Sequence, residues 1–471
     1  MKTPILDSLK NYSNEKNLRF HMPGHKGRDN NSPYMRVFKD ILDIDLTEVD
    51  GTDNLHLPEG AIKLSQEITS KAYGCSDSYY LVNGSTSGIY AMIGAVTSYG
   101  DKIIVQRNCH RSVFMAMYMN SLQGVWVAPK IIEEFGIASC VTPDDIEKAA
   151  LENPLAKAIV ITSPTYYGTC ADIASISKIA KKYNMKLLVD GAHGAHFPFS
   201  SNMPSSPITL GADMEVVSTH KTLPSLTQTA ILNATSSIDK SKLRFMLSLY
   251  QSTSPSYILM ASIEAGIAYM IDNGEEDINR VITYIEDFLI RLPKSYTLLT
   301  RDNIGEGDFD FDRTRLVIKC PLGGKATEGI LREEYNIQVE MSDAYNIVII
   351  GSVFDSEEDY KNLLNALISI SKRDNSTKGR NNIKGYDYSS TSVMSIRSGY
   401  DSESIEVKLD DAVDRISCEM ISPYPPGIPV VLPGERLTIE KINSLKEGLN
   451  NNVQINGAKD STLEYITVLK Y

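Results

Sequence analysis

Short apolar runs alternate with longer amphipathic segments over residues 61–270 of the chain. The runs "SYYLV", "KIIVQ", "AKAIVIT", "KLLVD" and "MEVV" have the length and continuous hydrophobicity of buried strands. Segments between them, such as "AIKLSQEITSKAYG" and "ADIASISKIAKKYN", have the pattern of helices, and the first ends at a glycine. Continuous apolar strands separated by helices are typical of a parallel sheet covered on both faces, so the pattern predicts an α/β fold.

The same pattern divides the chain into five stretches. Residues 1–60 are polar and turn-rich and are expected to form an N-terminal arm with little core of its own. Residues 61–270 are predicted to form a large α/β domain, and residues 271–372 a small α+β domain. The polar stretch 373–400 is interpreted as a linker. Residues 401–471 are expected to form a third, C-terminal domain, because 471 residues exceed one ordinary core.

Charge and composition exclude several classes of function. A net charge of −12 argues against a nucleic-acid partner, because phosphate binding needs an excess of Lys and Arg. The chain has no run of about 18 apolar residues, so no membrane-spanning helix is expected. Six scattered cysteines without a CxxC pair, and an N-terminus without an apolar signal core, favour a cytoplasmic protein. All seven histidines lie in the first 220 residues, which places the expected chemistry there.

The segment "NGSTSG" joins a predicted strand to a predicted helix. Small residues let the backbone approach a ligand closely, and the N–H groups at a helix start bind anions. Together with the hydroxyls of Ser85, Thr86 and Ser87 they form a candidate phosphate site. The alternative is an N-capping turn rich in Ser and Thr. The GK[ST] ending of a P-loop is missing.

Two other strand ends carry polar side chains. His110 follows "KIIVQ" and is either a ring stacker or base, or an ordinary half-buried histidine. Asp190 ends "KLLVD", where a buried carboxylate requires a cation or a strong donor. His193 and His196 follow, and with Asp190 they resemble a metal-ligand set. HxxH in a glycine-containing loop is poor geometry for zinc, so no metal is expected.

Lys221 follows the predicted strand "MEVVST" and is either a solvated cation or a reactive amine. Ser218 and His220 beside it can donate hydrogen bonds to an anion. A phosphate site, a flat side chain, a buried carboxylate and an amine are the groups that hold pyridoxal 5′-phosphate (PLP). They occur here in that order along the chain, so the pattern predicts a PLP enzyme.

Nine segments resemble the Orn/Lys/Arg decarboxylases of PLP fold type I, in their short bacterial form, with the biosynthetic arginine and lysine decarboxylases most similar. The fold that this resemblance implies is a PLP-dependent transferase-like large domain with a mostly parallel sheet, a small α+β domain and a C-terminal domain. The segments run in family order along essentially the whole chain: "FHMPGHKGR", "DNLHLPEGAI", "NGSTSGI", "RNCHRSV", "SPTYYGTCADI", "VDGAHGAHF", "STHKTLPSLTQTAIL", "STSPSYILMASIE" and "YPPGIPVVLPGE".

The resemblance also implies a role for each candidate residue. Lys221 would form the Schiff base, Asp190 would pair with the pyridinium nitrogen, His110 would stack on the ring, and His193 would lie beside the cofactor. Contacts to the phosphate are implied for Ser85, Thr86, Ser87, Ser218 and His220.

Family members are dimers or dimer-based oligomers with shared active sites. The resemblance therefore implies that Thr253 or Ser254 reaches the partner's cofactor phosphate. The chain departs from the family's pattern in three places. It has "TLPS" after the lysine, a short third domain, and Gly191 where short relatives often carry Glu.

The implied reaction is α-decarboxylation of a small basic amino acid to CO2 and an amine, with arginine favoured over lysine or ornithine. His110, His220 or Lys221 could return a proton to Cα. The sequence leaves open whether Asp50, Asp53 or Glu59 binds the substrate's distal cation, or whether these are surface acids or helix caps.

Two rival interpretations remain. One is a PLP-dependent aminotransferase or another PLP lyase, in which Arg315 clamps the substrate carboxylate. The other is a non-catalytic homologue that acts as a binding partner.

Overall fold

The computed structural model describes residues 1–305, 307–373, 388–424, 427–450 and 453–470. The chain forms two compact units. The first consists of Met1–Ala95 and Gly191–Asp277, and the second of Val96–Asp190 and Ile278–Tyr471.

The first unit contains a three-stranded antiparallel sheet in the order β1-β10-β9. Its strands are β1 (Asp77–Leu81), β10 (Ala230–Ala234) and β9 (Met214–Val217). In the register, Leu81 lies opposite Ala230 and Val217 opposite Ile231, so β10 begins where β1 and β9 end. The apolar pattern predicted β1 and β9 correctly. It did not predict β10 or the antiparallel pairing, because a fully buried strand carries no signal of its direction.

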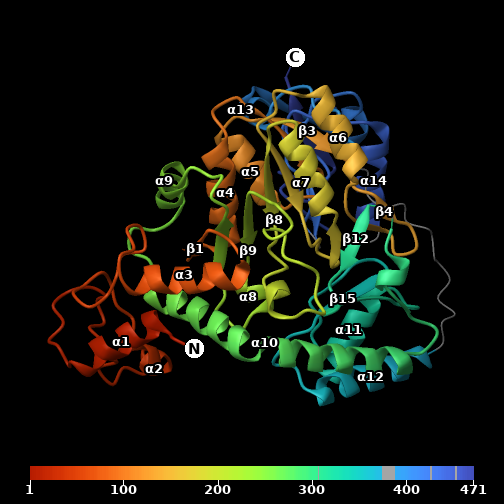
Figure 1. The fold of residues 1–471 in the computed structure, drawn as a ribbon. Coiled ribbons are helices and arrows are strands. Elements are labelled where there is room, and N and C mark those ends of the chain that lie inside the picture. The colour runs from red at the N-terminus through yellow and green to blue at the C-terminus, as the bar shows by residue number, and fades with distance from the viewer. Residues whose placement is uncertain (306, 374–387, 425–426, 451–452, 471) are drawn as a thin grey trace. The chain divides into compact units, whose positions relative to one another are not determined.

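The predicted helices of the first unit are present as α3 and α4, and the structure adds helices in the arm and after β9. Gly74 ends α3 with a φ of 68°, a left-handed conformation that favours glycine. The arm is not devoid of core, because Ile5 and Leu9 of α1 are buried and the Glu264 carboxylate accepts the N–H of Ile5 at 2.9 Å. Figure 1 shows α3 above the first part of α10. The helices are α1 (Pro4–Asn14), Arg36–Phe38 and Phe197–Phe199 (both 3-10), α2 (Lys39–Leu42), α3 (Ala61–Tyr73), α4 (Gly84–Val96), α8 (Thr219–Thr222), α9 (Lys240–Tyr250) and α10 (Tyr257–Arg291), the last helix continuing into the second unit.

The second unit contains four parallel strands in the order β8-β6-β2-β3, as the apolar pattern predicted. Because the strands are parallel, their carboxyl ends lie along one edge. Helices α5, α6 and α7 accompany these strands in the chain and in space (Figure 1). The elements are β2 (Lys102–Gln106), α5 (Arg111–Met119), β3 (Gln123–Val127), α6 (Pro143–Glu152), β6 (Ala158–Thr162), α7 (Ile173–Lys182) and β8 (Lys186–Asp190).

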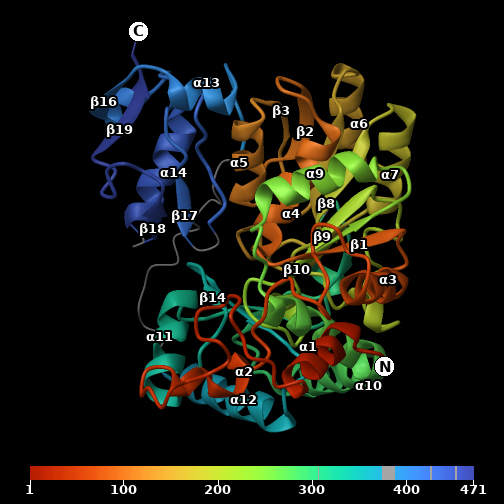
Figure 2. The same ribbon diagram turned by 90° about the vertical axis from the view of Figure 1, so that its left-hand side faces the viewer.

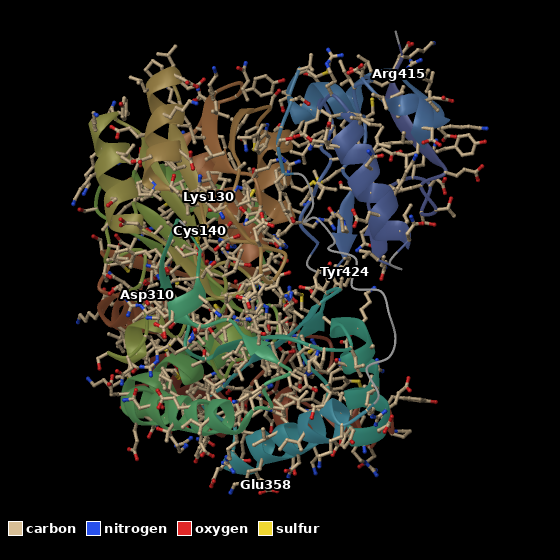
Figure 3. All side chains as sticks on the ribbon, turned by 90° about the vertical axis from the view of Figure 1, so that its right-hand side faces the viewer. Lys130, Cys140, Asp310, Glu358, Arg415 and Tyr424 are labelled. Carbon is tan, nitrogen blue, oxygen red and sulfur yellow. The ribbon has the colours of Figure 1, made fainter. Side chains whose placement is uncertain are left out.

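Two small hairpin-like sheets and a four-stranded antiparallel sheet complete the middle of the second unit. Helices α11 and α12 pack together on a core that includes Phe288, Leu316 and Leu364. Figure 3 labels Lys130 and Cys140, which flank the β4–β5 pair and are joined from N–H to carbonyl at 2.9 Å. The elements are β4 (Ile131–Ile132), β5 (Ile137–Ala138), β7 (Thr169–Ala171), β11 (Thr297–Leu298), Arg301–Asn303 (3-10), β12 (Asp308–Phe311), β13 (Arg315–Lys319), α11 (Gly324–Tyr335), β14 (Met341–Ser342), β15 (Asn346–Ile350) and α12 (Glu357–Ser371).

Residues after 388 form a C-terminal subdomain with a core of its own, which includes Ile421, Val431 and Leu445. Figure 2 shows α14 beside the β16–β19 pair, and Figure 3 labels Arg415 and Tyr424 within the same subdomain. Much of the predicted linker 373–400 falls on 374–387, outside the described residues. The elements are α13 (Ile396–Asp401), β16 (Ser404–Lys408), Leu409–Ala412 (3-10), β17 (Ser422–Tyr424), α14 (Ile439–Asn450), β18 (Gln454–Asn456) and β19 (Tyr465–Leu469). Within the described ranges, no helix has the length and hydrophobicity that a membrane crossing requires.

Candidate active site

Lys221 lies in α8, the single turn that follows β9, and its amine faces a histidine. Its Nζ is 2.9 Å from Nε2 of His193, a buried side chain two residues beyond Gly191. Because an ammonium group can only donate, the imidazole accepts at Nε2 and carries its own proton at Nδ1. The structure therefore brings two of the predicted site residues together. The histidine is positioned to receive the proton that the amine must lose before it can act as a nucleophile.

Ser218, the residue at which β9 gives way to α8, is fully buried. Its Oγ has no hydrogen-bond partner among the described residues. A buried hydroxyl without a partner is unfavourable, and an anionic oxygen would satisfy it. This orphaned hydroxyl fits the predicted phosphate contact.

His220 is oriented by the backbone. Its Nδ1–H donates to the carbonyl of Thr229 at 2.7 Å. Burial lowers the pKa of His220, and the nearby positive charge of Lys221 lowers it further, while the Thr229 carbonyl opposes both. In the neutral ring Nε2 is an acceptor, so donation to a phosphate requires the imidazolium, which a nearby phosphate dianion would favour.

The predicted phosphate loop leads from β1 into α4. Gly84 has a φ of 71° and begins the helix, with Ser85 and Thr86 half-buried in the first turn. The Ser87 hydroxyl donates to the carbonyl of Gly84 at 2.9 Å, so its proton is used within the turn. Ser85 and Thr86 are thus better placed than Ser87 to donate hydroxyl protons to a phosphate.

Gln228 and Thr229 connect this loop to the lysine segment, a role that the sequence did not reveal. The N–H of Gly84 donates to the carbonyl of Gln228 at 2.9 Å, and Gln228 Nε2 donates to the Val82 carbonyl at 3.0 Å. Thr229 accepts from His220 and from the hydroxyl of Thr219 at 2.7 Å. The only signal was the "SLTQ" stretch after the lysine, which had been noted for its similarity to the family and given no function.

In the second unit, Asp190 ends β8 and is buried, with 3% of its surface exposed. Its register partner in β6 is Thr162, whose Oγ1 is buried without a hydrogen-bond partner among the residues described. A carboxylate and a free hydroxyl therefore share the carboxyl edge of the parallel strands, where ligands bind in α/β sheets.

His110 follows β2 at the same edge and caps α5. Its Nδ1 accepts the N–H of Ser112 at 3.3 Å and lies 2.8 Å from the Ser112 hydroxyl. The proton of the neutral ring is therefore on Nε2. The side chain is exposed, and Ser112 fixes its Nδ1.

Asp53 is a helix cap. Its carboxylate accepts the N–H groups of Glu59, Gly60 and Ile62 at 2.9–3.0 Å, ahead of α3. Although burial opposes ionisation, these backbone hydrogen bonds hold the pKa of Asp53 below its usual value. Of the open alternatives for this residue, the structure favours the cap over a contact to substrate.

Thr253 and Ser254 are exposed in the turn before α10. The preceding residue is tied to the arm, because His56 Nε2–H donates to the Ser252 carbonyl at 2.8 Å. Their side chains are thus free for a contact outside the first unit's own core.

Arg315 is fully buried and lies 3.9 Å from the Asp312 carboxylate. Among the described residues, no three His, Cys, Asp or Glu side chains are grouped as a metal ion would require.

Glu215 leaves no room for a side chain at position 191. A Cβ at position 191 would lie 2.8 Å from Glu215 Oε1. Glu215 is fully buried, accepts from the Ser206 hydroxyl at 2.8 Å, and lies opposite Asn233 in the sheet. The departure at Gly191 is therefore coupled to a buried acid in β9, the next strand along the chain.

Burial raises the pKa of Glu215 to about 7, and the Ser206 hydrogen bond only partly offsets this. Because the native pKa exceeds the unfolded one, stability is highest below about pH 4.5 and falls as pH rises to about 7. We expect wild type to lose about 3 kcal/mol relative to Glu215→Gln between pH 5 and pH 8. Urea unfolding of both proteins at the two pH values measures this, and parallel pH dependences would contradict it.

Comparison with known proteins gives a family. The Orn/Lys/Arg decarboxylase major domain matches residues 3–298, and the C-terminal domain of the same family matches residues 389–447. An arginine decarboxylase of Bacillus subtilis is 32% identical, over 100% of this chain and 98% of its own length. The constitutive lysine decarboxylase of Escherichia coli is 23% identical, over 93% of this chain and 76% of its own.

A solved structure supports the fold. The crystal structure of a lysine decarboxylase from Francisella novicida superposes with a TM-score of 0.88 at 20% identity, covering 99% of this chain and 81% of the other. The predicted fold type is confirmed by this likeness and by the family match. The chain belongs to the Orn/Lys/Arg decarboxylase family.

Proposed function

We propose that this protein is a PLP-dependent decarboxylase that converts arginine to agmatine and CO2, with lysine and ornithine as poorer substrates. The observation that carries the proposal is the placement of Lys221 Nζ at 2.9 Å from His193, next to the unpartnered hydroxyl of Ser218. A reactive amine and an unsatisfied donor for an anion are the two features that distinguish a PLP site from a solvated lysine. The full-length likeness to arginine decarboxylases supports arginine as the substrate.

PLP fits the donor set. The orphaned hydroxyls of Ser218 and Thr162 are buried polar atoms that a ligand would satisfy. Asp190 offers a carboxylate for the pyridine nitrogen, and the start of α4 offers N–H groups for the phosphate. When bound, PLP supplies an electron sink for the pair of electrons left on Cα as CO2 departs.

The chain's own residues would divide the work. Lys221 would hold the cofactor through its amine, and His193 would accept the proton that this amine loses. Asp190 keeps a proton on the pyridine nitrogen, because a buried carboxylate stabilises a cation beside it. His110 lies against the ring.

The phosphate would be bound by Ser85, Thr86, Ser218 and His220. The Ser87 contact is the weakest, because its hydroxyl proton already serves Gly84.

Three residues, His110, His220 and Lys221, are candidates to return a proton to Cα. His220 would donate to the cofactor phosphate, so its proton would be committed there while PLP is bound. His110 carries its proton on Nε2, with Nδ1 committed to Ser112. We therefore propose that His110 or the amine of Lys221, and not His220, supplies the proton.

The test is a direct assay. Purified protein saturated with PLP is incubated separately with arginine, lysine and ornithine, and CO2 and the amine product are measured. We expect agmatine from arginine at the highest kcat/KM. Release of CO2 from none of the three would refute the proposal, and faster formation of cadaverine or putrescine would reassign the substrate.

We further propose the five-part division predicted from the sequence, with an arm at 1–60, a large domain at 61–270, a small domain at 271–372, a linker at 373–400 and a C-terminal domain at 401–471. The separate core around Ile421 and Val431 supports a C-terminal domain, and Tyr388 of the predicted linker packs against that core. A cytoplasmic location is supported by six free thiols.

A homodimer with shared sites is the proposed assembly. The arm exposes large apolar side chains, with Phe20 92%, Tyr34 85% and Val37 80% exposed. Contact between such a surface and water is unfavourable, so a partner is expected to cover it. A second copy of the chain is the proposed cover for this surface. Thr253 or Ser254 would then contact the partner's cofactor phosphate.

Sedimentation equilibrium tests this assembly. We expect a mass about twice the 52.1 kDa of the chain. Phe20→Ser should shift the protein toward monomer. Leu155→Ser, which changes a residue 80% exposed outside the arm, should not. A wild-type monomer at micromolar concentration would contradict the proposal.

A further inference from the structure

A cluster of fully buried charges joins the C-terminal subdomain to the turn that carries His110. Arg107, three residues before His110, has no exposed side-chain surface. Its Nη2 lies 3.2 Å from Oε2 and 3.3 Å from Oε1 of Glu435 and donates to the Val430 carbonyl at 3.2 Å. Lys441 Nζ also lies 3.3 Å from Glu435 Oε2.

The Glu435 carboxylate is saturated by this arrangement. Besides the two cations it accepts the Ser390 hydroxyl at 2.5 Å and the Leu432 N–H at 3.0 Å. Arg107 and Lys441 hold the pKa of Glu435 below its usual value although burial opposes this. Buried charges persist only when they are paired and hydrogen-bonded, so the docked subdomain is required for Arg107 to stay where it is.

Two further hydrogen bonds join the C-terminal subdomain to the elements around this turn. Trp126 of β3 donates its indole N–H to the Ser392 hydroxyl at 2.8 Å, and its ring lies 5.6 Å from the Arg107 guanidinium. At the far end of α5, the Tyr118 hydroxyl donates to Asp401 of α13 at 2.9 Å. The subdomain thus contacts the last turn of α5 and the segment just before its first residue.

We propose that Arg107 and Glu435 are positioning residues, through which the C-terminal subdomain sets the orientation of His110 against the cofactor ring. The connection is short, because Cys109 N–H bonds back to the Gln106 carbonyl at 3.2 Å and His110 caps α5. Misplacement of a site group by about 1 Å can cost about 10²-fold in rate. The inference rests on the proposed role of His110.

The first test uses the protein without PLP. Trp126 is the only tryptophan in the sequence, so tryptophan fluorescence arises from a side chain that contacts both Arg107 and Ser392 of the subdomain. Glu435→Gln should shift its emission to longer wavelength as the indole meets water. Glu419→Gln is the matched control, because Glu419 is also buried in the subdomain, and its carboxylate accepts the N–H of Thr467 at 3.1 Å. An unchanged emission in Glu435→Gln would overturn the inference.

The second test is a double-mutant cycle on PLP affinity. Glu435→Gln should weaken PLP binding about 10-fold or more in the wild-type background, and less than about twofold in the His110→Ala background. A purely structural role would give the same loss in both backgrounds and would overturn the inference. If Glu435→Gln does not fold, Ser390→Ala, which removes one hydrogen bond to the carboxylate, replaces it in both tests.

The role of Glu435 can be tested independently of the proposed decarboxylase activity. Wild-type protein that binds PLP but releases no CO2 would refute the decarboxylase proposal, while the cycle on PLP affinity would still decide the role of Glu435.

Discussion

Lys221→Ala is expected to abolish both the visible absorption of PLP-loaded protein and its decarboxylase activity. The absorption arises from the covalent link between cofactor and lysine, and alanine has no amine to form it. We expect kcat/KM to fall by about 10³-fold or more, the order found when a nucleophile is removed. Absorption spectra after gel filtration, together with CO2 release, measure both effects.

Lys178→Ala is the matched control, since Lys178 is an exposed lysine of α7 in the part of the chain that carries Asp190. It should keep colour and activity. A Lys221→Ala protein that remains coloured after gel filtration would show that another amine binds the cofactor.

Asp190→Asn is expected to lower kcat strongly while PLP remains bound. The carboxylate is 3% exposed at the end of β8, and its charge there would keep the pyridine nitrogen protonated. An amide of the same shape cannot do so, and the cofactor becomes a weaker electron sink. We expect a loss of about 10²–10³-fold in kcat, with PLP affinity reduced far less.

Asp213→Asn, in the turn before β9, serves as a control for the loss of one carboxylate in the chain. If Asp190→Asn retained wild-type kcat, the pairing of Asp190 with the pyridine nitrogen would be wrong.

Much of the fold could be predicted from local pattern. The apolar runs at β2, β6 and β8 are continuous because these strands are buried on both faces. The end of α3 was also visible, because Gly74 follows the last residue of its helical pattern. Strand β10 was missed. Its run is equally apolar, but only the register with β1 and β9 reveals that it runs antiparallel.

The sequence predicted which residues of the candidate site carry reactive groups. It did not predict the hydrogen bonds that orient those groups. The pairing of Lys221 with His193 unites two residues that the sequence had singled out. The tautomer of His220 was not visible, because it is set by the Thr229 carbonyl nine residues later. Arg107 and Glu435 are 328 residues apart, so no local sequence pattern indicates that they pair.

Product stoichiometry from arginine labelled at its carboxyl carbon tests the central claim most directly. PLP-loaded protein is incubated with the labelled substrate, and labelled CO2, agmatine and the 2-oxo acid are measured together. A decarboxylase should give one agmatine for each labelled CO2 and no 2-oxo acid, with Lys221→Ala giving neither product. Formation of the 2-oxo acid with the label retained would show transamination, and would contradict the proposed function.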